Sequence, residues 1–270
     1  MTTRSNGKKV AFVGFDDGFA AMEALANEGC QLLKLFTCQV DPATESNAQV
    51  IAKAQQLQIP YTTQKITRQD LQWLKDNGCQ LLLSAAYYHK IPTDPTLPMV
   101  NIHPTCLPRG RGGWPTPVMI LRGEKQGGVT FHKIASSFDT GDIILQHTFP
   151  LAEDEDLETL MAKVYRQIPP MVHELLSDFD RLYQNAKPQG PGEVYPTPTA
   201  ADFTVTEQMP AQQIDRILRA FRGFPCLVHK GGWEYVLLHG AYHSAPPAGG
   251  PAFPYGPGYL SGEWLEKHPL

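Results

Sequence analysis

Residues 9–36, KVAFVGFDDGFAAMEALANEGCQLLKLF, set the pattern for the first half of the chain. The first seven residues form the apolar run of a buried strand, the middle has the apolar spacing of a helix that ends near Gly29, and QLLKLF is a second strand. The alternation continues with helices expected at residues 46–58 and 67–78, the latter capped by Thr67, and strands at residues 80–86 and 99–103. Strands that alternate with helices predict an α/β fold with an open, doubly wound, mostly parallel sheet.

The second half of the chain changes character. Two strands joined by a turn at 139–142 are followed by a segment, residues 156–183, that is helical on both sides of its prolines. A Pro/Gly-rich stretch then predicts a linker, and beyond residue 200 we expect one helix, short strands and an irregular loop at 246–259. The domains expected are a catalytic domain at 1–185, a linker at 186–200 and a small, β-rich, truncated barrel-like domain at 201–270.

Composition and charge limit the classes of protein. The apolar fraction of 42% and the charged fraction of 19% are ordinary for a globular protein. The apolar runs are shorter than the roughly 20 residues of a membrane helix, and the N-terminus leads directly into a strand without a signal-peptide core. We therefore expect a cytoplasmic protein without a membrane partner. A net charge of −4 and the lack of a Lys/Arg run favour a small-molecule substrate over nucleic acid.

The five cysteines are odd in number and are never spaced as C-x-x-C. This pattern argues against a disulfide framework and against a zinc site, so we expect no metal.

The stretch NIHPTCLPRGRGGWPTP, residues 101–117, follows a strand end, where α/β sheets bind their ligands. Asn101 and His103 are two residues apart on a strand, so both side chains face the same side. Near neutral pH an imidazole can take a proton from an attacking amine or donate to a developing oxyanion, and a carboxamide N–H can hold the oxyanion without titrating. Asp139, at a second strand end, is the candidate carboxylate for the imidazole, although an Asp in such a turn, taken alone, is more often a turn former.

These residues resemble a known family. NIHPTCLPRGRGGWP, residues 101–115, is similar to the N-x-H-x-S-x-L-P-x-x-R-G signature of folate-dependent formyltransferases. GGVTFHKIASSFDTGDIILQ, residues 127–146, resembles the second block of that family, in which the Asp of a D-x-G turn completes the site. The resemblance covers most of residues 8–185, and a weaker one at 197–225 is similar to the opening of the family's small C-terminal barrel domain.

The resemblance implies a Rossmann-like formyltransferase that transfers the formyl group of 10-formyltetrahydrofolate, its co-substrate, to a primary amine. Asn101, His103 and Asp139 match the catalytic positions of the family. The segments that match the folate-binding positions are Ser84, Ala85, Ala86, Tyr87, Tyr88, Lys90, Ile91, Ser136, Phe138, Thr140, Gly141 and Asp142. Candidate substrate-binding residues are Pro104, Thr105, Arg109, Arg111 and Gly112.

Two positions depart from the family pattern. Thr105 replaces the usual Ser and keeps a hydroxyl, and Gly110 stands where relatives commonly carry an aromatic residue. The Gly either opens room for a substrate or changes only the packing of the loop. Arg109 and Arg111 suit a phosphate or carboxylate of the substrate, but Arg111 could equally fix the loop by bonding backbone carbonyls.

The resemblance leaves several acceptors open. Methionyl-tRNA formyltransferases normally carry a longer, more basic C-terminal domain, and glycinamide ribonucleotide transformylases generally lack the second domain. The short second domain and the negative charge therefore favour a sugar-nucleotide N-formyltransferase. The alternatives are methionyl-tRNA, glycinamide ribonucleotide, an amino acid or hydroxyornithine-type metabolite, and a folate-binding relative without activity. The apolar and aromatic residues of the second domain also suit a homodimer.

Overall fold

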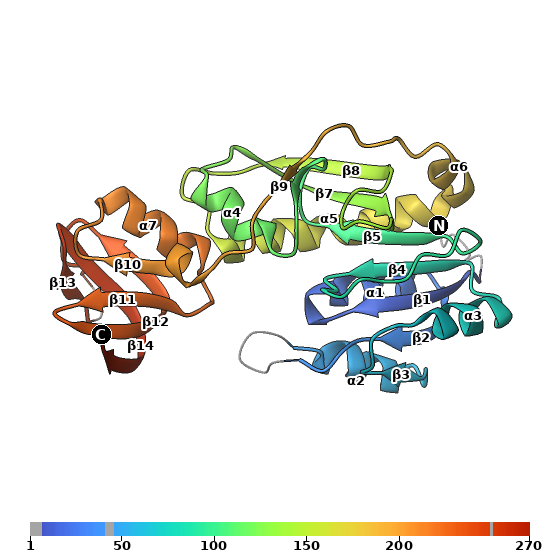
Figure 1. Cartoon of the computed structure of the whole chain (residues 1–270), viewed down its shortest axis with the longest axis horizontal. Helices are drawn as coiled ribbons and strands as arrows, with labels where there is room; N and C mark the ends of the chain where they lie inside the picture. Colours follow the sequence, from blue (N-terminus) through green and yellow to red (C-terminus); the bar gives the residue numbers. More distant parts are fainter. Residues whose placement is uncertain (1–6, 41–45, 249–250) are drawn as a thin grey trace. The chain divides into compact units, whose positions relative to one another are not determined.

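The chain forms two compact units, seen here in a computed structural model that describes residues 7–40, 46–248 and 251–270 (Figure 1). Unit 1 comprises Met1–Arg111, Gly128–Thr148 and Val164–Val194, and unit 2 comprises Gly112–Gly127, Phe149–Lys163 and Tyr195–Leu270. Unit 2 thus includes two segments, 112–127 and 149–163, that the expected division at 185 and 201 places in the first domain. As domain boundaries, 1–185 and 201–270 remain predictions.

Unit 1 is built on a seven-stranded sheet in the order β3-β2-β1-β4-β5-β7-β8 (Figure 1). Its first five strands pair in parallel, and β7 then pairs antiparallel with β5. The strands are β1 (Lys9–Gly14), β2 (Gln31–Phe36), β3 (Tyr61–Thr62), β4 (Leu81–Ala85), β5 (Met99–His103), β7 (Gln126–Lys133) and β8 (Ile143–Pro150). The expectation of an open, mostly parallel α/β sheet is confirmed.

Short helices connect the parallel strands. They are α1 (Phe19–Asn27), preceded by the 3₁₀ turn η1 (Asp16–Gly18), α2 (Ala48–Gln56) and α3 (Arg68–Asp76). Thr67 caps α3 as predicted: its hydroxyl accepts from the N–H of Asp70 at 3.3 Å, and the Asp70 carboxylate accepts from the N–H of Thr67 at 2.9 Å. This capping box fixes the start of α3.

The helix over the prolines differs from expectation. Helix α5 (Leu157–Ser177) runs through Pro169 and Pro170 without a break and is followed by α6 (Phe179–Gln184). Both prolines are exposed, while Ile168, Met171 and other residues of the apolar face are buried on either side of them. Burial of one continuous apolar face therefore outweighs the hydrogen bonds that the prolines remove.

The predicted linker is bonded to unit 1. Strand β9 (Glu193–Val194) pairs in parallel with β6 (Arg109–Arg111), and Lys187 forms an antiparallel bridge with Ile143. The Pro/Gly-rich composition suggested a spacer, but its backbone groups find partners as far as residue 194.

Unit 2 contains a five-stranded sheet in the order β10-β11-β12-β14-β13. Helix α7 (Ala211–Ala220) contacts β12 and helix α4 (Pro115–Leu121), and it buries Ile214, Ile217 and Leu218. The remaining elements are η2 (Ala200–Phe203), β10 (Thr204–Thr206), β11 (Cys226–Lys230), β12 (Trp233–His243), β13 (Phe253–Tyr255) and β14 (Gly258–Pro269). A small β-rich C-terminal region is confirmed.

The irregular loop expected at 246–259 was wrong in its second half. Residues 249 and 250 lie outside the described residues, but Phe253–Tyr255 pairs antiparallel with the start of β14 across a tight Gly256–Pro257 turn. Strand β14 itself was not predicted, because its pairing with β12 provides the hydrogen bonds that its composition does not suggest. In the described part of the chain, no helix combines the length and apolar character needed to cross a membrane.

Candidate active site

Strand register brings the candidate residues to one face of the sheet. In the antiparallel pairing of β5 with β7, Asn101 lies opposite His132 and His103 lies opposite Thr130. Directly opposed residues project to the same face, and so do residues two apart on one strand. Asn101, His103 and His132 are therefore neighbours because of this register.

Asp139 reaches the same place from the loop between β7 and β8. Its backbone is left-handed, with φ of +54°, and Gly141 beside it packs so closely that a Cβ would lie 1.8 Å from the carbonyl oxygen of Lys133. The side chain is 9% exposed, and its Oδ1 lies 3.5 Å from Nδ1 of His103 and 3.5 Å from Nε2 of His132. The structure thus brings Asn101, His103 and Asp139 together, and their catalytic roles remain predictions.

The partners of the two imidazoles fix where their hydrogens lie. Nε2 of His103 is 2.7 Å from the carbonyl oxygen of Gly110, and Nδ1 of His132 is 2.8 Å from that of Lys133. A carbonyl oxygen only accepts, so both of these nitrogens carry hydrogen. When the rings are neutral, Nδ1 of His103 therefore directs its lone pair at the Asp139 carboxylate, and the lone pair of His132 Nε2 is available to the amide N–H of Asn101. One added proton in this cluster would turn a repulsive contact into an attractive one, which suits a group that receives a proton.

Burial opposes a positive charge on His103. The side chain is 5% exposed. Desolvation lowers the pKa of His103 below its usual value, whereas the Asp139 carboxylate and the Gly110 carbonyl raise it in part. The neutral form therefore predominates at neutral pH, ready to accept a proton.

The described contacts of Asn101 use one of the two N–H groups of its amide. One N–H of its amide lies 3.1 Å from Nε2 of His132, the lone-pair nitrogen of that ring. This bond orients the amide, and the half-buried side chain can direct its second N–H to a developing oxyanion.

His132 is the residue that sequence reasoning missed. It is 2% exposed and contacts both Asn101 and Asp139. The available signal was its place in the strand VTFHK, because a histidine in a strand that pairs with NIH can project to the same face as Asn101 and His103. Only the register of the two strands identifies it.

The candidate substrate-binding residues mostly hold their own loop. Thr105 is buried, and its hydroxyl donates to the carbonyl oxygen of Arg109 at 2.9 Å. Gly110 has φ of +78°, and a Cβ there would lie 2.9 Å from Cγ2 of Thr105. The lack of an aromatic residue at position 110 is thus explained by the packing of the loop.

The two arginines differ in exposure. Nε and Nη2 of Arg111 donate to Oε1 of Gln189 at 3.2 and 2.7 Å, and Nη2 also donates to the Gly190 carbonyl at 3.3 Å. Arg109 is 58% exposed at its side chain and lies 3.7 Å from Glu193. Of the two, Arg111 fixes the loop, and ligand binding by Arg109 remains a prediction. Pro104 follows the end of β5, and Gly112 follows β6.

The segments expected to bind folate lie at two strand ends. Ser84 and Ala85 are buried at the end of β4, and Ala86 is left-handed with φ of +52°. Phe15 stacks on both tyrosines that follow, at 5.9 Å from Tyr87 and 5.2 Å from Tyr88. Lys90 is exposed and Ile91 is buried after them.

The loop 136–142, which carries Asp139, presents exposed groups beside buried ones. Phe138 is 58% exposed directly before Asp139, and Ser136 and Thr140 are exposed as well. Gly141 is buried, and Asp142 pairs with Lys133 at 3.3 Å. An exposed aromatic ring next to a buried carboxylate suits a flat heterocycle.

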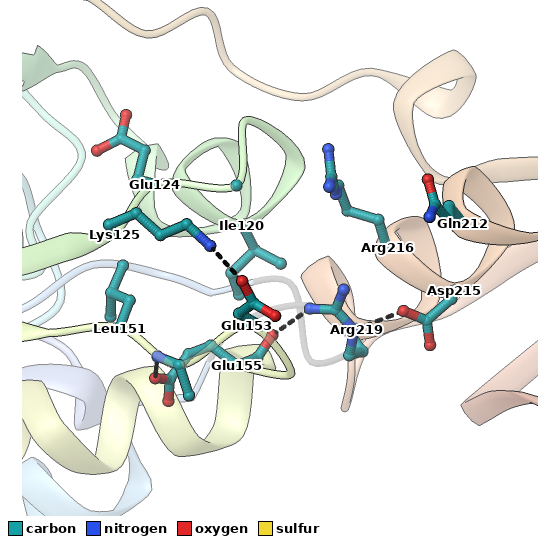
Figure 2. A pocket seen from close by; sticks show the side chains of 12 residues that line it. Ile120, Glu124, Lys125, Leu151, Glu153, Glu155, Gln212, Asp215, Arg216 and Arg219 are labelled. Carbon is teal, nitrogen blue, oxygen red and sulfur yellow. Dashed lines mark hydrogen bonds and ion pairs between the residues drawn. The ribbon is translucent and has the colours of Figure 1, made fainter.

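A cavity of about 280 Å³ lies in unit 2 (Figure 2). It is lined by α4, α7 and the residues near Leu151, and four of its charged groups form two ion pairs: Lys125 with Glu153 at 3.2 Å and Arg219 with Asp215 at 2.8 Å. None of the candidate site residues lines it.

Parts of the sequence are similar to known formyltransferases. The model of the formyl transferase family matches residues 34–175, just over half of the chain. Methionyl-tRNA formyltransferase of Treponema denticola is 33% identical over 179 residues, which are 63% of this chain and 54% of that protein. The chain therefore spans little more than half of that relative's length.

Two solved structures share the fold. HypX from Aquifex aeolicus, in complex with tetrahydrofolic acid, has a TM-score of 0.65 at 16% identity and covers 96% of this chain and 43% of its own. A sugar N-formyltransferase from a Shewanella species has a TM-score of 0.60 at 18% identity and covers 83% of this chain and 93% of its own. At these identities the likeness concerns the fold alone, whereas the family match rests on the sequence. The chain belongs to the formyl transferase family.

Proposed function

We propose that the protein transfers the formyl group of 10-formyltetrahydrofolate to a primary amine, and that this amine belongs to a nucleotide-linked aminosugar. The observation that carries the reaction is the cluster of Asn101, His103, His132 and Asp139 at the end of β5. It combines a neutral hydrogen-bond donor, the Asn101 amide, with a buried base, the His103 imidazole, and transfer of a formyl group to an amine needs both.

The reaction follows from these groups. The amine nitrogen attacks the formyl carbon, and the second N–H of Asn101 stabilises the oxyanion that forms. The lone-pair nitrogen of His103, Nδ1, takes up the amine proton, and the Asp139 carboxylate 3.5 Å away stabilises the resulting imidazolium. The bond from the formyl carbon to N10 of tetrahydrofolate then breaks, N10 receives the proton, and tetrahydrofolate leaves.

The co-substrate is supported by the family and by a relative. The HypX structure contains tetrahydrofolic acid. In this chain, the residues that match the folate-binding segments flank the cluster on two loops, one carrying Tyr87 and Tyr88 and the other Phe138. Their aromatic rings suit the pterin or the aminobenzoyl ring, because flat heterocycles stack on such side chains.

The choice of acceptor rests on charge. Residues 201–270 carry five Lys or Arg against six Asp or Glu. Several of these cations are already paired: Arg219 with Asp215 at 2.8 Å, Arg222 with Glu158 at 3.2 Å and Lys230 with Glu207 at 4.0 Å. A surface that grips an RNA backbone needs cations that phosphates can reach. Paired cations favour a small acceptor.

Methionyl-tRNA is the second candidate, because the curated relative from Treponema denticola carries that name. The test is tetrahydrofolate release from 10-formyltetrahydrofolate with a panel of aminosugar nucleotides, methionyl-tRNA, glycinamide ribonucleotide and ornithine derivatives. We expect turnover with one aminosugar nucleotide, loss of turnover in His103→Ala, and a mild response to salt. Turnover of methionyl-tRNA alone, weakening steeply as salt rises, would reassign the acceptor. No turnover with any amine would refute the proposed reaction.

A further inference from the structure

Residues 187–194 bond to both loops that hold the candidate site. Lys187 and Ile143 exchange two backbone hydrogen bonds of 2.8 Å, directly after the loop of Asp139. At its other end, the N–H of Glu193 donates to the carbonyl oxygen of Pro108 at 3.1 Å, before Gly110. The segment therefore joins two loops that are far apart in the sequence.

The centre of this segment is the carboxamide of Gln189. Its Nε2 donates to the carbonyl oxygens of Asp139 at 3.0 Å and Gly141 at 2.6 Å. Its Oε1 accepts from Nε and Nη2 of Arg111 at 3.2 and 2.7 Å. A carboxamide has two N–H groups and one oxygen with two lone pairs, so this side chain is fully used.

Each arm of the carboxamide acts on one side of His103. The donor arm holds the backbone of Asp139, which is left-handed and therefore needs support from its surroundings. The acceptor arm holds Arg111. The residue before it, Gly110, provides the carbonyl that accepts from Nε2 of His103. The two contacts of the imidazole, at Nδ1 and at Nε2, thus depend on loops that the same side chain ties together.

We infer that Gln189 is a positioning residue, which holds the Asp139 carboxylate and the Gly110 carbonyl against the two ring nitrogens of His103. This inference rests on the proposed formyl transfer for its effect on rate. It does not make Gln189 a group that touches the substrate.

Two substitutions separate positioning from mere tethering. Gln189→Glu keeps the size and an acceptor for Arg111, with a stronger, charge-assisted bond, but a carboxylate cannot donate to Asp139 and Gly141. Gln189→Met keeps the volume and removes both arms. Gln184→Glu is the matched control, because it adds the same charge at an exposed position of α6.

The experiment measures kcat, the KM for 10-formyltetrahydrofolate and the Tm of these variants. We expect both Gln189 variants to lower kcat by about 10- to 100-fold, as displacement of a reacting group by about 1 Å does, while KM for the folate stays within about twofold. Gln184→Glu should behave as the wild type. A purely structural tether predicts instead that Gln189→Glu, with its stronger bond to Arg111, keeps the wild-type kcat.

A second readout does not depend on turnover. The His103 imidazole is titrated by NMR in histidine-labelled protein, assigned with His103→Ala. The groups that face the ring are Asp139, the Gly110 carbonyl and His132, and Asp139 raises the pKa of His103. Release of Asp139 in Gln189→Met should therefore lower the pKa of His103.

The outcomes are distinct. An unchanged kcat together with an unchanged His103 titration in both Gln189 variants overturns the inference, even if Tm falls. If the wild type transfers a formyl group to no amine, the proposed function fails, and the titration alone still decides whether Gln189 positions Asp139.

Discussion

The buried cluster of unit 1 and the cavity of unit 2 are both rich in charged and polar side chains, but they differ in what those side chains can do. In the cluster, two imidazoles lie 3.5 Å from one carboxylate oxygen, and His103 and Asp139 are 5% and 9% exposed. In the cavity, Lys125 and Glu153 are largely exposed and pair with each other. Buried groups that can accept or donate a proton, rather than open volume, distinguish the cluster as the candidate active site.

The largest expected effect comes from the proton acceptor. His103→Ala removes the base of the cluster and should lower kcat by about 10²–10⁴, the range typical of a positioned general base. Tetrahydrofolate release in single-turnover and steady-state assays measures it. A variant that keeps more than a tenth of the wild-type kcat would show that the proton goes elsewhere.

The pH dependence of kcat/KM tests the contact between Asp139 and His103. Because burial lowers the pKa of His103, kcat/KM should stay high down to a midpoint below about 6.5 and fall at lower pH, where His103 is protonated. Asp139 raises this pKa, so Asp139→Asn should move the midpoint to still lower pH as well as slow the reaction. A midpoint that stays fixed or rises in Asp139→Asn would contradict the direct contact between the two groups.

An intermediate effect is expected at Gly110, whose carbonyl oxygen accepts a hydrogen bond from Nε2 of His103. Gly110→Ala places a Cβ in a left-handed conformation and against Thr105, which should lower the free energy of unfolding by about 1–2 kcal/mol. Gly190→Ala is the control, since a Cβ there meets nothing within 4 Å. Urea unfolding of both variants checks this, and equal stabilities would argue against the tight packing of the 105–111 loop.

The smallest effect is expected in the cavity of unit 2. Arg216 lines it on α7, and its guanidinium lies near Gly123. Arg216→Ala should leave kcat and KM within about twofold, as surface changes away from a site do. A tenfold rise in the KM of the acceptor would instead make the cavity a substrate site.

Much of the sheet could be predicted from the sequence because its signals are local. The capping box at Thr67 and the apolar runs of β1 and β4 need no tertiary contact to be recognised. The strand β14 lacked such a signal: a Pro/Gly-rich stretch precedes it, and pairing with β12 makes it extended. The continuity of helix α5 was harder to predict, because two prolines indicate a helix break and only the burial of the neighbouring residues stabilises the unbroken helix.

The candidate site divides in the same way. Asn101, His103 and Asp139 carry a motif, so their proximity could be predicted. His132 depends on the register between β5 and β7, and Gln189 depends on how a Pro/Gly-rich segment lies against two loops. Local composition predicts neither the register of two strands nor the way a segment packs against two loops.

One measurement tests the central claim most directly: tetrahydrofolate release by the wild type, Asn101→Ala and Arg216→Ala with one acceptor amine under the same conditions. In the proposed reaction Asn101 supplies the oxyanion donor, so its loss should lower kcat by about 10²–10³ while Arg216→Ala remains within about twofold of the wild type. An Asn101→Ala variant as active as Arg216→Ala would contradict the assignment of the chemistry to the buried cluster.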